Sequence, residues 1–123
     1  MDTSQRPLRV AVVGPCASGK STVVEQLRRW GYDAFSVSQE HSVVRDLWRR
    51  RAPEALVYLD VSYDTLTARR GRGWPRAVYE QQIARLEDAR RHATIVVDTG
   101  ATSVSGTLAR IVAALERRCG PTS

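Results

Sequence analysis

The residues best suited to chemistry in this sequence lie together near its start, in the stretch Gly14-Pro15-Cys16-Ala17-Ser18-Gly19-Lys20-Ser21. This stretch fits the pattern G-x-x-x-x-G-K-[ST] at every fixed position. Lys20 is also the only lysine in a chain with eighteen arginines. The lysine ammonium is compact and sits on a slim stem, whereas the guanidinium is broad and planar. A chain that otherwise uses arginine therefore has a physical reason to keep lysine where a cation must enter a narrow backbone cradle.

The pattern predicts a loop that binds phosphate. Its backbone N–H groups are expected to surround an anion, to which the following helix presents its positive end. Gly19 permits close approach of the backbone, Lys20 reaches the β- and γ-phosphates, and the Ser21 hydroxyl ligates Mg²⁺. The predicted site for a nucleoside triphosphate, with ATP and Mg²⁺ as cofactors, consists of Gly14, Pro15, Cys16, Ala17, Ser18, Gly19, Lys20, Ser21 and Thr22.

Predicted strands and helices alternate along the whole chain. Short runs rich in β-branched and aliphatic residues predict strands at 8–13, 34–38, 55–61 and 94–98. Apolar residues at helical spacing predict helices at 21–30, 43–51, 62–71, 76–93 and 103–118, with Trp30, Val43, Val44, Val78 and Val104 on their apolar faces. Ser62 is expected to cap the third of these helices. The alternation predicts one α/β domain over residues 1–123, with a short, mainly parallel sheet covered on both faces.

The chain beyond the loop resembles the small-molecule kinases of the P-loop NTPase superfamily, in a shortened form. Deoxynucleoside kinases, thymidylate kinase, adenylate kinase and shikimate kinase show elements in the same order. The resemblance implies a three-layer α/β/α P-loop NTPase fold and transfer of a phosphoryl group from Mg-ATP. It rests on Pro53-Glu54-Ala55-Leu56-Val57-Tyr58-Leu59-Asp60-Val61-Ser62, then Leu66, Arg69, an arginine-rich loop, the Tyr79–Arg91 helix and Ile95–Gly100.

The resemblance also implies which side chains outside the loop act on phosphate. Arg69, Arg72 and Arg76 are similar to lid arginines, which close over the phosphates and stabilise charge on the transferring group. Glu40 follows the second predicted strand and Asp60 ends the third, so both are expected at the carboxyl edge of the sheet, where ligands bind. The catalytic candidates are Lys20, Glu40, Arg69 and Arg72; Arg76 is a further phosphate-binding candidate, and the metal candidates are Ser21, Glu40 and Asp60.

Departures from those kinases leave more than one function open. Typical members have five core strands and an inserted helical region that binds the phosphate acceptor, whereas only residues 39–54 lie between the second and third predicted strands. The first interpretation is a kinase-like enzyme with an unknown small-molecule acceptor. The alternative is a non-catalytic nucleotide sensor or partner-binding module. A nucleic-acid-binding role is less favoured, because Trp30, Trp48 and Tyr79 fall on apolar helix faces. Lys20 is the only lysine, so no N-K-x-D guanine motif exists, which favours ATP.

Charge and composition narrow the functional class only slightly. A net charge of +6 indicates non-specific attraction to polyanions rather than a defined function. No apolar run approaches the roughly 18 residues of a membrane span, and the start of the chain shows no signal-peptide pattern, so we expect a cytoplasmic protein without a membrane partner. Cys16 and Cys119 fit no metal-binding spacing. A short sheet leaves an edge or an apolar face exposed, and a homodimer is one way to cover it.

Overall fold

Four parallel strands form the centre of the structure, a computed structural model that describes residues 7–71 and 74–118. The strands lie in the order β2-β1-β3-β4. The predicted α/β class and parallel sheet are therefore confirmed, and every strand pair among the described residues is parallel. The strands are β1 (Arg9–Val13), β2 (Asp33–Ser36), β3 (Ala55–Asp60) and β4 (Ile95–Asp98).

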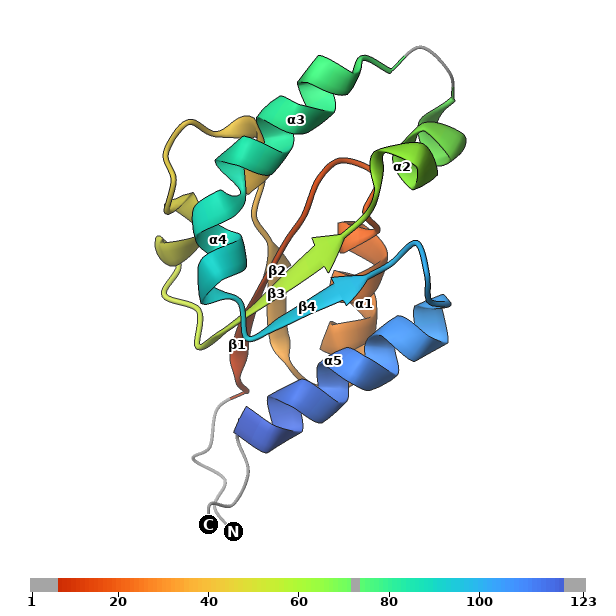
Figure 1. Ribbon diagram of the computed structural model, residues 1–123. Coiled ribbons are helices and arrows are strands. Elements are labelled where there is room, and N and C mark those ends of the chain that lie inside the picture. The colour runs from red at the N-terminus through yellow and green to blue at the C-terminus, as the bar shows by residue number, and fades with distance from the viewer. Residues whose placement is uncertain (1–6, 72–73, 119–123) are drawn as a thin grey trace, which may run out of the picture.

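Helices cover both faces of this sheet (Figure 1). One face carries the first and last helices, and the other carries the two helices that precede β4 together with two short 3₁₀ turns. The described helices are α1 (Lys20–Arg29), α2 (Tyr63–Arg70), α3 (Arg76–Arg85), α4 (Glu87–His92) and α5 (Val104–Arg118), and the 3₁₀ turns are η1 (Gln39–His41) and η2 (Leu47–Arg49).

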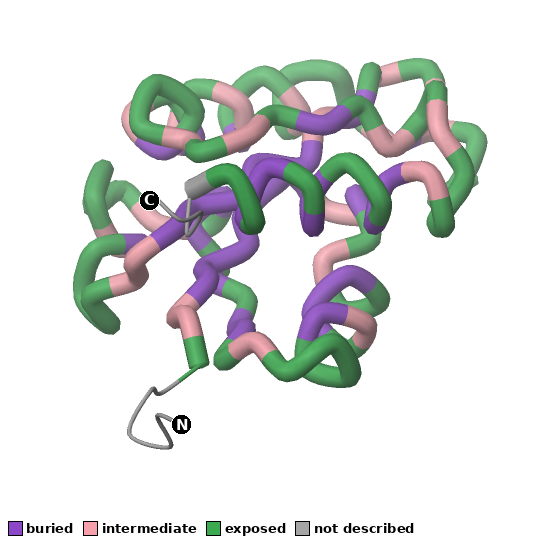
Figure 2. The backbone as a smooth tube through the Cα atoms, turned by 90° about the horizontal axis from the view of Figure 1, so that it is seen from below, coloured by how far each residue is buried: buried purple, intermediate pink, exposed green. Residues whose placement is uncertain are grey.

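The alternation of side chains along the strands divides the core in two. Val10 and Val12 face the cluster formed with α1 and α5, whereas Ala11 and Val13 face the cluster formed with α4 and η2. Figure 2 shows the buried residues concentrated along the strands and on the helix surfaces turned toward them. Strands buried on both faces explain the continuous apolar runs in the sequence. No helix of the described residues is both long enough and apolar enough to span a membrane.

The helix predicted at 43–51 is wrong. The structure has only the two 3₁₀ turns around this segment, and Val43 is 80% exposed. The buried position is taken instead by Gln39, whose amide donates to the Val44 carbonyl oxygen at 2.6 Å and accepts from the Trp48 N–H at 3.0 Å. A buried polar side chain that satisfies backbone groups organises this segment as a loop. Buried Trp48 and half-buried Leu47 provide its apolar contacts with the core.

The helix predicted at 76–93 is interrupted at Leu86. α3 ends at Arg85 and α4 begins at Glu87. The residues of this segment that face the core are therefore Gln82, Leu86 and Ala89, whereas Val78 is exposed. Leu86 is fully buried, which confirms one of the predicted inward residues.

The observed ends of the helices agree with the sequence predictions better than their buried faces do. Ser62 caps α2 as predicted, because its side chain accepts the Thr65 N–H at 3.1 Å. Gly31 has φ +102° directly after α1, which is the left-handed conformation expected of a glycine past a helix end. Trp30 lies at that end and is 60% exposed, so its predicted core position is wrong. Val104, the first residue of α5, is exposed as well.

Candidate functional site

The glycine-rich loop lies at the carboxyl edge of the sheet, between β1 and α1 (Figure 1). The next strand in the sequence, β2, lies on one side of β1, and the strand after it, β3, lies on the other side of β1. The end of β1 is therefore the point where the strand order reverses. In open parallel α/β sheets, ligands bind in the crevice at such a point.

Two glycines of the loop are required by its geometry. A Cβ atom on Gly14 would lie 2.6 Å from the Leu59 carbonyl oxygen, so this position packs against β3 without a side chain. Gly19 has φ +95° as the residue before α1, a left-handed conformation that favours glycine. Ala17 is also left-handed, with φ 62°, which costs roughly 1–2 kcal/mol for a residue with a Cβ. The loop is thus a tight, strained concavity at the start of a helix.

Lys20 is held inside this concavity. Its ammonium Nζ donates to the Gly14 carbonyl oxygen at 2.7 Å and to the Pro15 carbonyl oxygen at 3.3 Å. The same nitrogen forms an ion pair with Glu40 Oε2 at 2.8 Å. The side chains of Lys20 and Glu40 are only 15% and 4% exposed, so the pair is largely removed from water. The structure therefore brings together two of the predicted site residues from different elements.

Glu40 has one carboxylate oxygen without a partner. Oε1 is buried and accepts no hydrogen bond among the described residues, although buried charged oxygens normally do. The η1 turn that carries Glu40 is fixed from outside, since Gln39 is fully buried and Arg85 Nη1 donates to the Glu40 carbonyl oxygen at 3.5 Å. A buried carboxylate with one free oxygen beside the glycine-rich loop can accept a cation or a proton donor.

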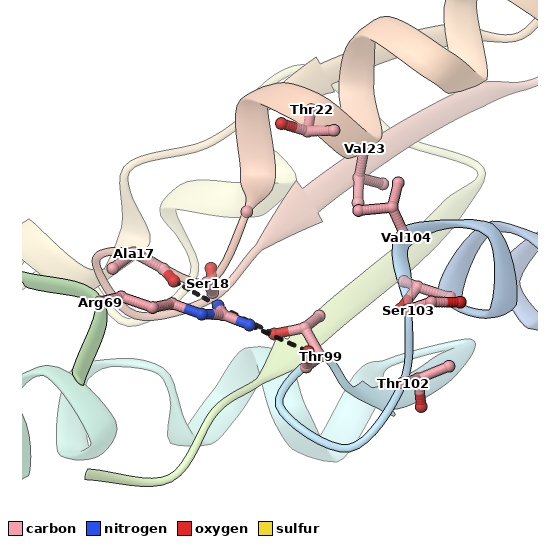
Figure 3. Close-up of a pocket in the computed structure, with 11 residues that line it drawn as sticks. Ala17, Ser18, Thr22, Val23, Arg69, Thr99, Thr102, Ser103 and Val104 are labelled. Carbon is pink, nitrogen blue, oxygen red and sulfur yellow. Dashed lines mark hydrogen bonds between the residues drawn. The ribbon is translucent and has the colours of Figure 1, made fainter. Parts of the chain in front are cut away.

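A cavity of about 500 Å³ adjoins the loop. Figure 3 shows its labelled walls: Ala17 and Ser18 of the loop, Thr22 and Val23 of α1, Arg69 of α2, and the segment that leads from β4 into α5. That last segment contributes Thr99, Thr102, Ser103, Val104 and Thr107. The sequence alone did not indicate that Thr99, Thr102 and Thr107 belong to the site. Their only signal was a run of hydroxyl residues between a strand and a helix.

Arg69 joins the loop to the turn after β4. Its guanidinium donates to the Ala17 carbonyl oxygen at 2.6 Å and to the Thr99 carbonyl oxygen at 3.0 Å (Figure 3). The structure thus places Arg69 beside the loop, and its predicted role as a lid arginine that acts on phosphate stays a prediction. Arg76 lies elsewhere, paired with Glu80 at 3.4 Å and stacked on the Tyr63 ring at 4.8 Å. Arg72 lies outside the described residues.

Asp60 ends β3 but pairs with Arg90 at 3.4 Å rather than with a residue of the loop. Arg90 also lies over the Tyr58 ring, 5.1 Å from its centroid. Burial raises the pKa of Tyr58 from 10.0 to about 12, because the phenolate would lose its hydration. Asp60 therefore belongs to a Tyr58–Asp60–Arg90 group, and within the described part of the chain its side chain makes no contact with the loop.

Cys16 of the loop contacts two residues from other elements, Gln82 and His41. Gln82, buried in α3, donates its amide to Cys16 Sγ at 3.2 Å and accepts the Cys16 N–H at 3.0 Å. His41 Nε2 lies 3.5 Å from the same sulfur and 3.6 Å from Glu40 Oε2. The sequence indicated this group only weakly, through a polar residue on the inward face of α3 four positions before Leu86.

Comparisons with known proteins assign no family to this chain. No family model matches it, and no curated protein matches its sequence. The function must therefore be inferred from the loop, the cavity and the charged groups between them.

Proposed function

We propose that this protein binds a nucleoside triphosphate, ATP in the first place, and that it is a shortened P-loop NTPase of the small-molecule kinase type. One observation carries the proposal. The ammonium of the only lysine is anchored on carbonyl oxygens inside a strained loop that ends in the N-terminus of α1. Helix N-termini and successive backbone amides attract phosphate, and the lysine adds a full positive charge at the same place.

Glu40 gives Lys20 a role that depends on the ligand. Without phosphate, the carboxylate neutralises the ammonium at 2.8 Å. A triphosphate would offer Lys20 stronger charge-assisted partners and would be repelled by Glu40 unless a cation lay between them. The pair therefore favours a phosphate ligand that arrives with a divalent metal ion.

The residues present fit Mg²⁺ together with that phosphate. The unpartnered Glu40 Oε1 offers a hard anionic oxygen, and Ser21 supplies a hydroxyl in the first turn of α1. We assign Glu40 and Ser21 to the metal, and retain Asp60 only as an expectation. When bound, Mg²⁺ would screen charge on the phosphates and orient them. Lys20 binds the terminal phosphates, and the loop amides with Thr22 bind those nearer the nucleoside.

The cavity beside the loop is the proposed nucleoside site. Its volume of about 500 Å³ lies within the ordinary range for small-ligand pockets, roughly 300–1,000 Å³. Gly19 and Thr22 line it and also belong to the predicted phosphate-binding stretch, so one ligand can occupy both. Arg69 forms one wall, from which it can reach the phosphates. Arg72 stays a predicted phosphate contact that lies outside the described residues.

Phosphoryl transfer to a small hydroxyl or phosphate acceptor is the proposed reaction. Such transfer depends on positioning and electrostatic stabilisation, which Lys20, Arg69 and Arg72 would provide, with Glu40 as the candidate base. A second function is favoured by the segment 37–54. It is short and folds onto the sheet through buried Gln39 and Trp48, where the kinases that the sequence resembles carry an acceptor-binding insertion. That observation supports a nucleotide sensor or partner-binding module without turnover.

Calorimetric titration of Mg-ATP tests the proposal directly. The control variant is Lys20→Met combined with Glu40→Gln, which removes both charges and leaves no unpaired buried ion. The intact protein should bind Mg-ATP at micromolar concentrations, and the double variant should not. The single variant Glu40→Gln, which leaves Lys20 charged, should still bind free ATP.

Phosphate release and transfer are then followed with nucleosides and small sugars as acceptors. Turnover with any acceptor supports the kinase, and binding without turnover supports the sensor. Absence of binding in the intact protein would contradict both functions.

A further inference from the structure

Cys16, Glu40 and His41 bring three metal-binding side chains to one point at the edge of the loop. Their ligand atoms all lie within 4.8 Å of one another. Cys16 comes from the loop after β1, whereas Glu40 and His41 come from η1 after β2. These segments meet because β1 and β2 are neighbours and parallel, so their carboxyl ends lie at the same edge.

The spacing of these atoms matches a tetrahedral metal site. Ligands bonded to Zn²⁺ at about 2.0–2.3 Å stand about 3.3–3.6 Å apart along the edges of a tetrahedron. The sulfur of Cys16 lies 3.5 Å from His41 Nε2, and that nitrogen lies 3.6 Å from Glu40 Oε2. Two of the three separations thus fit a tetrahedron, and the third, between Cys16 Sγ and the Glu40 carboxylate, is at most 4.8 Å and would have to shorten.

The contacts around Cys16, Glu40 and His41 favour the binding of a metal ion. The Gln82 amide donates to Cys16 Sγ at 3.2 Å, which orients the sulfur as hydrogen bonds to metal ligands usually do. Glu40 is buried, and its Oε1 has no partner within the described part of the chain. Lys20 pairs with Oε2, the oxygen that lies 3.6 Å from His41 Nε2, so a bound metal ion would take Oε1 after the carboxylate turns. The His41 side chain is exposed, which leaves a path for the ion from solvent.

We propose that Cys16, Glu40 and His41 bind a borderline-soft divalent transition metal ion, Zn²⁺ in the first place, at the edge of the phosphate-binding loop. The donor set decides the metal class, since thiolate and imidazole select Zn²⁺ over Mg²⁺. Three protein ligands leave the fourth position of a tetrahedron for water or another small ligand. This site shares Glu40 with the proposed Mg²⁺ site, but its donor set differs and it does not depend on nucleotide binding.

Zn²⁺ affinity, measured without nucleotide by competition with a chromophoric chelator, tests the site. The protein carries Cys119→Ser, so that Cys16 is its single thiol. One Zn²⁺ per chain should bind, excess Mg²⁺ should not displace it, and both Cys16→Ser and His41→Ala should abolish it. Gln82→Ala should weaken it by about 10–100-fold, as for other groups that orient a metal ligand. The matched control is His92→Ala, since His92 lies beside Asp88 at 3.6 Å, far from the loop in sequence.

The absorption spectrum of the Co²⁺-loaded protein is a second measurement, and a loss of stability would not produce the same signal. The Co²⁺ protein should show the ultraviolet charge-transfer absorption of a thiolate–metal bond, and Cys16→Ser should remove it. Zn²⁺ binding that survives Cys16→Ser and His41→Ala would overturn the proposal. So would a protein that binds no Zn²⁺ but whose Cys16 reacts rapidly with an alkylating reagent, because the group would then be a thiol–imidazole pair. Mg-ATP binding by the intact protein would be untouched by either failure.

Discussion

Lys20 is a residue through which both the stability of the fold and the proposed binding of phosphate can be tested. Its ammonium is bonded to Gly14, Pro15 and Glu40 at once, in a place where water is largely excluded. The net contribution of a buried ion pair to stability is small, since desolvation offsets the attraction. The loss of one partner is different, because it leaves the other charge buried and alone. The pair can therefore be probed by comparing single and double substitutions.

We expect Lys20→Met to destabilise the fold and Glu40→Gln to restore it in the double variant. The single change leaves the Glu40 carboxylate unpaired, at a cost of about 3–5 kcal/mol for a buried pair, toward the lower end because Lys20 keeps some exposure. Urea unfolding measures the free energy of each variant. If the double variant is no more stable than Lys20→Met, the two charges do not interact in the way the structure indicates.

Tyr58 should make stability fall in alkali. Burial raises its pKa from 10.0 to about 12, so the folded state holds the neutral phenol more tightly than the unfolded chain does. The stabilisation is complete below pH 10 and is lost as pH rises from 10 to 12, by up to about 1.4 kcal/mol per pH unit. Urea unfolding between pH 9 and 11.5 should show a steeper decline in the natural sequence than in Tyr58→Phe. Equal slopes would contradict the burial effect.

At the scale of elements, the short helix α2 links the loop to the rest of the site. Its last turn carries Arg69, which reaches Ala17 and Thr99, and its first turn depends on the Ser62 cap. The helix has few buried residues, with Leu66 as its buried anchor. The capping hydrogen bond is therefore a large part of what fixes this helix.

Ser62→Ala should lower the free energy of unfolding by about 1 kcal/mol, since the Thr65 N–H loses its acceptor. Ser62→Asp keeps an acceptor at the same position and should cost little. Chemical denaturation measures both variants. A Ser62→Asp variant as unstable as Ser62→Ala would show that the hydroxyl acts through another contact, such as the one it donates to Thr65 Oγ1.

At the scale of the whole molecule, the parallel sheet collects the candidate site along one edge. The carboxyl ends of β1, β2, β3 and β4 all lead into residues of the candidate site, because parallel strands end on the same side of the sheet. The outer strands β2 and β4 are short, and Val96 in β4 is partly exposed. The homodimer that would cover such an edge stays a prediction, which light scattering can check.

Binding of ATP should stabilise the whole fold. A ligand that binds only the folded chain adds about 2.7 kcal/mol at a concentration of 100 times its dissociation constant. For a chain of this size we expect a rise in Tm of several degrees in a thermal melt with Mg-ATP. The Lys20→Met, Glu40→Gln double variant should show no rise. A rise of the same size in that variant would place the nucleotide away from the loop.

The loop, the strands and most helix ends are determined by the sequence alone, because each depends on residues close together in the chain. The G-x-x-x-x-G-K-[ST] stretch, the β-branched runs and the Ser62 cap are local signals of this kind. Helix faces were harder to predict. The inward position of Gln82 and the exposed Val43 and Val78 depend on what packs against them.

Only the tertiary structure decided which side chains meet around the loop. Glu40 reaches Lys20, Arg69 reaches Ala17, and Gln82 reaches Cys16, from elements that follow β2, β3 and the α2–α3 connection. The spacing of cysteines in the sequence indicated no metal site, yet the strand order brings Cys16 to His41 and Glu40. The physical reason is that the loop is built by its own backbone, whereas its partners are set by the order of strands in the sheet, which no local pattern specifies.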